Sequence, residues 1–490
     1  MQIRQFPEKG VFCQLAKDNN IIPVCTEILA DTDTPVSLLK KFQGNDKPVF
    51  LLESVEGGEK WGRYSFLGIS ARCHLKVYQD TVTIQENGDI QHVDHHNDPL
   101  EVLKTYMEQY KTPVMADLPR FWGGLVGYLT YEMVSFFEKI PNRQEAGMAL
   151  AHFILPDELI IFDNIRHTLI CIVLGFVNDY PIADQVFEAA SRRIHTLLEE
   201  IQRPLPQGEK PTGEKSYKLA VRPDAGAYQP KVETTKEHIQ QGDIIQAVIS
   251  QPFTCESPPD PWSLYRAQRY VNPSPYLYFM DFDDMILVGS SPETMVRLEN
   301  GVATLRPIAG TRPRGDTPRQ DRHLADELLK DEKERAEHLM LVDLGRNDLG
   351  RVAITGSVQV TDLMIVERYS HVMHMVSNIN CDLKKSTTAW DLLKATFPAG
   401  TLTGAPKVRA MEIIADLEHG VRGPYGGAVG YISFSGNMDM AITIRTACIQ
   451  GGELIVRAGA GIVADSDPEA EHQETINKAM AIQKALEMLP

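Results

Sequence analysis

Three glycine-rich segments lie in the last fifth of this 490-residue sequence, and they constrain the fold and function more than any other feature. They read FPAGTLTGAP at 397–406, GPYGGAVGY at 423–431 and AGAG at 458–461. Glycine lets main-chain N–H groups approach a small ligand with no side chain between them. Because glycine-rich turns are often only turns, these segments indicate a ligand pocket only where other residues agree.

The third segment leads into a predicted helix that carries two carboxylates. Asp467 and Pro468 have the residue types of a helix N-cap followed by the first helical residue. Glu471 and Glu474 then lie three positions apart on one face, close to the start of this helix. Their oxygens are the hard ligands that a divalent cation prefers.

A second pair, Glu334 and Glu337, has the same spacing within a single helix that the pattern predicts over residues 321–344. Taken alone, such a pair is more often a solvated helix face than a binding site. Two pairs on separate helices can form a carboxylate cage for one Mg²⁺ ion, completed by water or substrate. The sequence therefore predicts a pocket that holds a small anionic substrate partly through magnesium.

The overall charge and the cysteines limit the class of protein. A net charge of −17 argues against nucleic acid as the main partner, because phosphate backbones select basic surfaces. The start of the chain has no apolar leader, and no apolar run is long enough to span a membrane. The seven cysteines are scattered and form no C-x-x-C pair, which is typical of free thiols. We expect a cytoplasmic protein that binds neither nucleic acid nor membrane.

The compositional pattern divides the chain into two regions. Prolines and charged residues concentrate around 204–226, which we interpret as a linker between an N-terminal region, 1–203, and a C-terminal region, 227–490. Short β-rich runs alternate with turn residues on both sides of this linker. They do not alternate strictly with helices, so the pattern favours an antiparallel α+β fold over a doubly wound parallel one.

Four kinds of side chain outside the glutamate pairs are candidates for chemistry. Glu293, at a predicted strand edge, can act as an acid if burial raises its pKa, although a surface turn would look the same in the sequence. His371 and His374 lack a third metal ligand nearby, so one of them is better interpreted as a base. Arg445 is a cation on an apolar predicted strand and suits a substrate carboxylate, to which Tyr425 can also donate.

Ten segments of the chain resemble the large, chorismate-binding subunits of anthranilate synthases, which belong to the chorismate-utilising enzymes. The resemblance extends over nearly the whole chain and is densest after residue 272. The segments are LLES (51–54), NPSPY (272–276), SPE (291–293), LRPIAGTRPRG (305–315), EHLMLVDLGRNDLGRV (337–352), ERYSHVMH (367–374), FPAGTLTGAPK (397–407), GGAVGY (426–431), IRTA (444–447) and AGAGIVADSDP (458–468).

This resemblance implies a fold and a reaction. The fold has two facing antiparallel sheets with helices packed outside, and the active site lies in the cleft between subdomains that interleave in space. The N-terminal region, 1–203, is regulatory, and 227–490 is the catalytic domain. The enzyme is a Mg²⁺-dependent lyase that adds ammonia to C2 of chorismate as the C4 hydroxyl leaves. Elimination of pyruvate then yields anthranilate, the first committed product of tryptophan biosynthesis.

The resemblance also implies a role for each candidate residue. Glu337 and Glu474 contact the metal directly, and Glu334 and Glu471 lie nearby. Glu293 serves as the acid and His374 as the base, while Tyr425 and Arg445 hold the pyruvyl carboxylate. The ring site is lined by Gly310, Thr311, Thr401, Gly459, Ala460 and Gly461.

Two positions distinguish this chain from relatives that also use chorismate. Aminodeoxychorismate-forming relatives read PIKGT, where the lysine attacks C2, whereas this chain has Ala309 at that place. Isochorismate and salicylate synthases have a water-activating lysine at the position of Gln246, which we count among the catalytic residues. A neutral amide cannot act as that base, so the resemblance implies that ammonia is the nucleophile.

The chain has no cysteine in a G-x-C-x-G elbow, so it lacks a glutaminase of its own. The resemblance implies a glutamine amidotransferase subunit as partner, in a heterotetramer or larger assembly. It also implies feedback by tryptophan at eight residues: Glu53, Ser54, Asn272, Pro273, Ser274, Pro275, Tyr276 and Leu277. Two alternatives remain open. They are an aminodeoxychorismate or isochorismate synthase, and a non-catalytic regulator that binds an amino acid.

Overall fold

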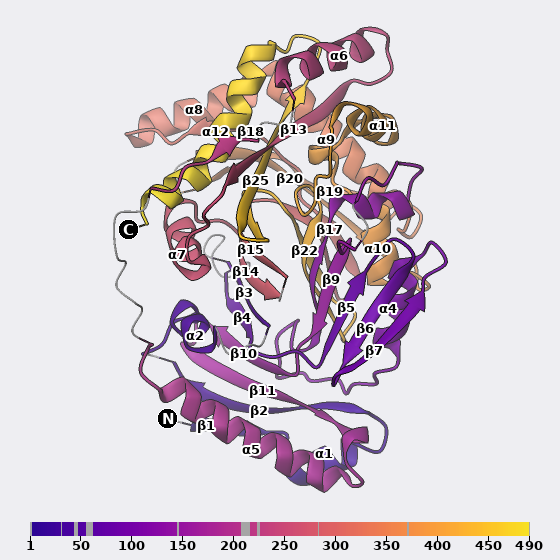
Figure 1. Ribbon diagram of the computed structural model, residues 1–490, viewed down its shortest axis with the longest axis vertical. Coiled ribbons are helices and arrows are strands. Elements are labelled where there is room, and N and C mark those ends of the chain that lie inside the picture. The colour runs from indigo at the N-terminus through magenta and orange to yellow at the C-terminus, as the bar shows by residue number, and fades with distance from the viewer. Residues whose placement is uncertain are drawn as a thin grey trace.

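Two large antiparallel sheets face each other across a shared hydrophobic core (Figure 1). The structure is a computed structural model. Side chains from both sheets meet in this core; the ring of Phe66 from one sheet lies 5.9 Å from that of Tyr431 from the other. The structure describes residues 2–30, 32–43, 48–54, 62–144, 147–206, 216–222, 226–282, 284–369 and 372–489.

Over the described residues, the strands of each sheet lie side by side in the following order. Sheet A contains β1 Gln2–Phe6, β2 Ile21–Leu29, β11 Thr168–Phe176, β10 Glu158–Asp163, β4 Tyr64–Gly68, β3 Val49–Glu53, β14 Tyr276–Phe282, β15 Met285–Ser291, β24 Thr446–Gln450, β25 Glu453–Ile462, β13 Gln246–Cys255 and β12 Ala220–Val221, with β21 Gly404–Ala405 paired to β13. Sheet B contains β18 Ile308–Pro313, β20 Val372–Asp382, β17 Val302–Leu305, β16 Thr294–Glu299, β23 Met438–Ile442, β22 Ala428–Ser433, β8 Gly124–Leu129, β9 Ala151–Leu155, β5 Cys73–Val77, β6 Thr81–Glu86 and β7 Asp89–Asp94, with β19 Gln359–Arg368 paired to β20.

Helices cover the outer sides of the sheets (Figure 1). At one end of the molecule α5 packs on β11 and on α1, and at the other end α12 packs on β25 beside α6 and α7. None of the described helices is long and apolar enough to cross a membrane. The α-helices are α1 Lys9–Leu15, α2 Pro35–Phe42, α4 Pro99–Glu108, α5 Ala183–Gln202, α6 Tyr228–Gln240, α7 Pro261–Val271, α8 Pro318–Lys330, α9 Glu332–Gly350, α10 Ala389–Thr396, α11 Lys407–Leu417 and α12 Pro468–Glu487; short 3₁₀ helices are η1 Tyr131–Phe136, η2 Val177–Asp179 and η4 Gly400–Leu402.

The architecture confirms the expected α+β class with two facing antiparallel sheets and outer helices. Both sheets, however, continue across the N-terminal and C-terminal regions of the chain. In sheet A, β3 pairs with β14, and in sheet B, β8 pairs with β22. The N-terminal region therefore shares both sheets with the rest of the chain.

The segment expected to be a linker is partly structured. Its residues 207–215 and 223–225 lie outside the described part of the chain. Between them, β12 pairs with β13 at the edge of sheet A, where Ala220 stands opposite Thr254. The amide of Leu219 also donates to Gln483 Oε1 of α12 at 2.8 Å. These contacts tie the segment to the C-terminal region.

The single helix predicted over 321–344 is wrong, because the structure has two helices there. Asp331 ends α8 and begins α9 with extended backbone angles, φ −66° and ψ 112°. Its carboxylate accepts a hydrogen bond from the amide of Glu334, which is an N-cap contact that starts a new helix. Residues 330–335 are all charged, so the apolar pattern carries no signal at the break. The break places Glu334 in the first turn of α9.

Candidate active site

A cavity of about 560 Å³ lies between the two sheets, where β13, β25 and β18 meet α9 and α12. All the residues predicted to bind substrate or metal, or to act in catalysis, line it with two exceptions, Ala460 and His374. Segments distant in the sequence therefore converge as expected. Its lining residues are Gln246, Val248, Glu293, Gly310, Thr311, Asp331, Lys333, Glu334, Glu337, Thr401, Leu402, Tyr425, Ile444, Arg445, Val456, Arg457, Ala458, Gly459, Gly461, Val463, Glu471, Glu474 and Lys478.

Two glycines of β25 leave room for two side chains of the cavity wall. A Cβ on Gly461 would lie 2.3 Å from Gln246 Nε2, and one on Gly459 would lie 2.8 Å from the hydroxyl of Tyr425. Ala460, which was expected to line the site, instead faces the core on the other side of the sheet. Successive residues of a strand point to opposite faces, so Gly459 and Gly461 face the cavity and Ala460 between them faces away.

Two side chains predicted to act on substrate lie where the chain crosses between the sheets. Glu293 follows β15 of sheet A and precedes β16 of sheet B, whereas Arg445 follows β23 of sheet B and precedes β24 of sheet A. The amide of Ser290 donates to the carbonyl of Arg445 at 3.2 Å, so the two crossovers are joined. Arg445 therefore lies in a turn, with φ +49°, and not on the apolar strand that the sequence predicts.

The carboxyl group of Glu293 is suited to donating a proton. Its side chain is 9% exposed. Burial raises the pKa of Glu293 to about 7, although the nearby Thr401 hydroxyl and Arg445 guanidinium lower it in part. A substantial fraction of Glu293 is therefore protonated at neutral pH, which is the state that a general acid requires.

His374 lies behind the cavity wall, on β20. It stands opposite Thr311 of β18, and its Nδ1 is 3.0 Å from the Thr311 hydroxyl and 3.3 Å from the carbonyl of Gly310. A carbonyl oxygen only accepts, so this contact places the proton on Nδ1 and leaves the lone pair on Nε2. Burial lowers the pKa of His374, which keeps the ring neutral and able to accept a proton. The other histidine considered, His371, lies outside the described residues.

The four predicted metal-binding glutamates line the same cavity from α9 and α12. Burial raises the pKa of both Glu337 and Glu471, and the neighbouring glutamate of each pair raises it further. Each carboxylate has a protein partner. The contacts are Arg312 Nη1 to Glu334 at 3.2 Å, Gln246 Nε2 to Glu337 at 3.4 Å, the Ser466 hydroxyl to Glu471 at 2.6 Å and Lys478 Nζ to Glu474 at 2.7 Å.

The donor set fits a magnesium ion in type. Hard carboxylate oxygens from two helices face one cavity, and their mutual repulsion is the kind of charge excess that a divalent cation relieves. Among the described residues, no group of three His, Cys, Asp or Glu side chains is arranged so that it could hold a metal ion. The carboxylates would therefore have to turn from their present partners toward the ion.

Lys478 is a site residue that the sequence reasoning missed. Its Nζ pairs with Glu474 and donates to the carbonyl of Gly459 at 2.9 Å, so it places a positive charge beside the glycine segment. The sequence does contain a usable pattern, because Lys478 follows Glu474 by four residues and must share its helix face.

A second cavity, of about 50 Å³, lies between β3 and β14 of sheet A and β22 of sheet B. Of the residues predicted to bind tryptophan, Glu53, Ser54, Pro275, Tyr276 and Leu277 line it. Its polar groups are paired with each other. Arg120 donates to Asp439 at 3.1 Å, and the Tyr276 hydroxyl donates to the same carboxylate at 2.8 Å.

The remaining residues of that prediction, Asn272, Pro273 and Ser274, do not line the second cavity. Asn272 lies between the two cavities, because its amide donates to the Ser290 hydroxyl at 3.2 Å and its Oδ1 accepts from Arg445 at 3.4 Å. The Ser290 hydroxyl also bonds to that of Ser274, at 2.9 Å. This segment therefore connects the second cavity to a residue of the first.

Comparisons with known proteins agree with this geometry. The family described as chorismate binding enzyme matches residues 48–484. The anthranilate synthase component 1 of Pseudomonas putida is 48% identical over 484 residues, covering 95% of each chain, and that of Acetivibrio thermocellus is 46% identical over 482 residues, covering 96% of this chain and 97% of the relative. The crystal structure of anthranilate synthase component I from Streptococcus pneumoniae TIGR4 has a TM-score of 0.77 and 37% identity, covering 93% of this chain and 99% of that one. This chain belongs to the chorismate-binding enzyme family.

Proposed function

We propose that this chain converts chorismate and ammonia into anthranilate and pyruvate, as the large subunit of an anthranilate synthase. The observation that carries the proposal is the identity of Gln246 in the cavity wall, supported by the names of the similar relatives. Its amide donates to Glu337 and cannot take a proton from water. The site therefore favours a nucleophile that needs no base, which ammonia is.

In the first step, Glu293 protonates the C4 hydroxyl of chorismate, which leaves as water while ammonia adds at C2. The raised pKa of Glu293, about 7, keeps enough of the acid form for this role. Arg445 and Tyr425 hold the enolpyruvyl carboxylate. Burial raises the pKa of Tyr425 to about 12, so its hydroxyl remains a hydrogen-bond donor. These contacts orient the substrate between the acid and the carboxylate-lined end of the cavity.

In the second step, His374 removes the proton from C2 through Nε2. The C3–O bond breaks, the ring becomes aromatic, and the enolpyruvyl methylene takes a proton to give pyruvate. The contacts of Nδ1 with Thr311 and Gly310, which both line the cavity, would orient the ring for this role. Aromatisation supplies the driving force.

The proposed cofactor is Mg²⁺, bound by Glu337 and Glu474 with Glu334 and Glu471 beside them. It would neutralise the ring carboxylate of chorismate against the cluster of glutamates. Lys478 already supplies a positive charge there, at the carbonyl of Gly459. Gly310, Thr311 and Thr401, with the main chain of β25 at Gly459 and Gly461, would line the rest of the ring site.

We also propose that tryptophan binds at the second cavity and inhibits the reaction. That cavity contains a cation, Arg120, and two carboxylates, Glu53 and Asp439, which match the two charged groups of a free amino acid. Asn272 would transmit its occupancy to Arg445. Ammonia would come from a glutamine amidotransferase partner, because the chain has no glutaminase elbow.

The decisive assay follows anthranilate fluorescence from purified chain with chorismate and ammonium chloride, with and without Mg²⁺ and with and without tryptophan. We expect fluorescence that requires Mg²⁺ and falls with tryptophan. Formation of isochorismate or aminodeoxychorismate in place of anthranilate would instead indicate the alternative synthases. Binding of tryptophan with no turnover of chorismate would indicate the non-catalytic regulator.

A further inference from the structure

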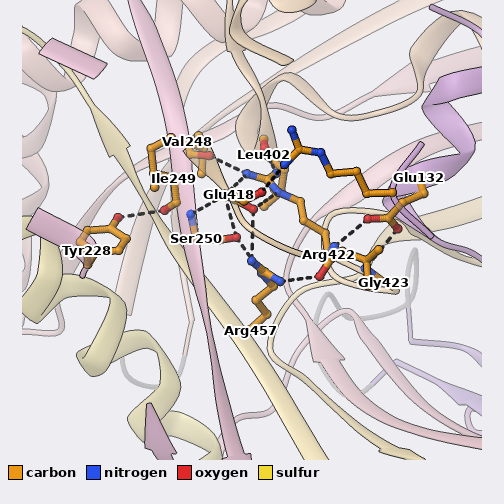
Figure 2. Close-up of polar contacts among 12 residues, drawn as sticks. Glu132, Tyr228, Val248, Ile249, Ser250, Leu402, Glu418, Arg422, Gly423 and Arg457 are labelled. Atoms are coloured by element: carbon orange, nitrogen blue, oxygen red, sulfur yellow. Dashed lines mark hydrogen bonds and ion pairs between the residues drawn. The ribbon is translucent and has the colours of Figure 1, made fainter. Parts of the chain in front are cut away.

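A buried carboxylate, Glu418, ties together all three glycine-rich segments (Figure 2). It lies just after α11 and is 3% exposed. Arg422 donates to it at 2.7 and 2.9 Å, and Arg457 donates at 3.2 Å. Arg422 directly precedes the second glycine-rich segment and Arg457 directly precedes the third. Arg422 also donates to the carbonyl of Leu402, in the first segment, at 2.7 Å.

The same network reaches the N-terminal region through Glu132 of η1 (Figure 2). The carboxylate of Glu132 accepts from the main-chain amides of Arg422, at 2.6 Å, and Gly423, at 3.1 Å. The amide of Tyr131 donates in return to the carbonyl of Gly423 at 2.8 Å. Three hydrogen bonds from η1 therefore hold three consecutive peptide units of the glycine-rich turn.

These peptide units are one anchor of the turn that presents Tyr425. The other anchor is Thr443, whose carbonyl accepts from the amide of Gly426 at 2.9 Å. Tyr425 lies between the two anchors and faces the cavity. The guanidinium of Arg422 lies 4.5 Å from the ring of Tyr131 and 5.8 Å from that of Tyr425, so the contact surface continues from η1 to the site.

The position of the buried Glu132 carboxylate is tightly constrained by its hydrogen bonds. Glu132 is 7% exposed, and a buried carboxylate is stable only where hydrogen bonds replace water. The two amide donors supply them, and no other group on the turn could substitute for both. A shift of η1 must therefore move the turn or leave a buried charge unpaired.

We infer that Glu132 is a positioning residue for Tyr425, through which the N-terminal region sets the shape of the substrate site. The inference rests on the proposed function only for the role of Tyr425 in holding the enolpyruvyl carboxylate. Glu132 acts on substrate binding through the turn at 422–427 and not through the overall stability of the protein.

The test combines three variants of the full chain. Glu132→Gln keeps the shape of the side chain but replaces one acceptor with a donor that faces a main-chain amide. Tyr425→Phe removes the hydroxyl, and the third variant carries both changes. Asp163→Asn is the matched control, because Asp163 is also buried and accepts from two main-chain amides, of Ile165 and Arg166, in a turn outside the cavity.

We expect Glu132→Gln and Tyr425→Phe each to raise KM for chorismate about tenfold, with kcat changed less than about threefold. If Glu132 acts through Tyr425, the double variant should resemble Tyr425→Phe alone, because the two effects share one contact. Asp163→Asn should leave KM unchanged even where it lowers the melting temperature. Multiplied effects in the double variant, near a hundredfold, or an unchanged KM in Glu132→Gln would overturn the inference.

Hydrogen–deuterium exchange provides a readout that needs no substrate. Glu132→Gln should speed amide exchange in the peptide covering 422–427, whereas Asp163→Asn should not. Unchanged exchange in that peptide would overturn the inference even if KM changed. If the unaltered chain formed no anthranilate, the proposed function would fail, and the exchange result would still decide whether Glu132 holds the turn.

Discussion

The two cavities between the sheets differ in how their charges are satisfied. In the large cavity, the Arg445 guanidinium contacts the neutral amide of Asn272, at 3.4 Å, and burial raises the pKa of Glu293 to about 7. In the small cavity, Asp439 already binds Arg120 and Tyr276, and Glu53 accepts from the Tyr265 hydroxyl at 2.5 Å. The large cavity is therefore electrostatically prepared for a ligand, and the small one is satisfied without one.

Their sizes differ in the same direction. A volume of about 560 Å³ suits a small metabolite, whereas about 50 Å³ has room for little more than a water molecule. An amino acid can enter the small cavity only if its walls, which belong to both sheets, move apart. Binding there must then alter how the sheets face each other, and the large cavity lies between the same sheets. Feedback would follow from this shared geometry.

The largest loss of activity should follow from removing negative charge in the large cavity. Glu337→Gln and Glu474→Gln should each lower kcat about 10³-fold, because a lost carboxylate weakens both the magnesium site and the field on the substrate. The measurement is anthranilate formation across a Mg²⁺ titration. Glu332→Gln is the control, since Glu332 starts the same helix but does not line the cavity. Full activity in both site variants would contradict the metal assignment, while tryptophan binding should persist in each.

Glu293 should show its altered pKa in the pH dependence of the rate. Its acid form is lost as pH rises through about 7, so kcat should fall about tenfold per pH unit above that value. His374, whose pKa is lowered, must be neutral, so the acid limb should lie below pH 6.5. Glu293→Gln should lower kcat about 10²- to 10⁴-fold and abolish the alkaline limb. An unchanged alkaline limb in this variant would assign it to another group.

The raised pKa of Glu293 also predicts that the stability of the folded protein depends on pH. The folded pKa of Glu293, about 7, lies above the ordinary value of 4.5, so the folded state holds its proton more tightly. The free energy of unfolding should therefore decrease as pH rises from about 4.5 to about 7, and this group should contribute up to about 3 kcal/mol of the decrease. Glu293→Gln should flatten that part of the curve in chemical denaturation.

The sequence predicted this site well where chemistry is carried by short motifs. The glutamate spacings, the N-cap at Asp467 and the convergence of the glycine segments depend on local pattern, and the structure shows each of them. Strand alternation would also have excluded Ala460, had it been applied to AGAG. The turn at Arg445 was missed because a crossover between sheets follows from tertiary pairing, and local apolar residues do not reveal it.

The sequence does not predict the role of Glu132. It is 290 residues from Arg422, within a stretch that has no motif, and its partners are main-chain amides with no side-chain identity. Contacts of this kind follow only from the register in which β8 pairs with β22, which places η1 against the turn. The N-terminal region therefore contributes to the site by geometry that only the folded chain displays.

A milder change is expected from a substitution in the small cavity. Ser54→Ala should raise the tryptophan concentration needed for half-inhibition about 3- to 10-fold, the cost of one neutral hydrogen bond, and leave uninhibited turnover unchanged. Ser70→Ala is the control, because Ser70 is a buried serine that does not line this cavity. Inhibition curves at saturating chorismate, with and without each substitution, give the measurement. If Ser54→Ala slowed uninhibited turnover, the two cavities would not be separable in function. If it changed neither property, tryptophan would have to bind elsewhere, and the closed, charge-paired cavity would be part of the core alone.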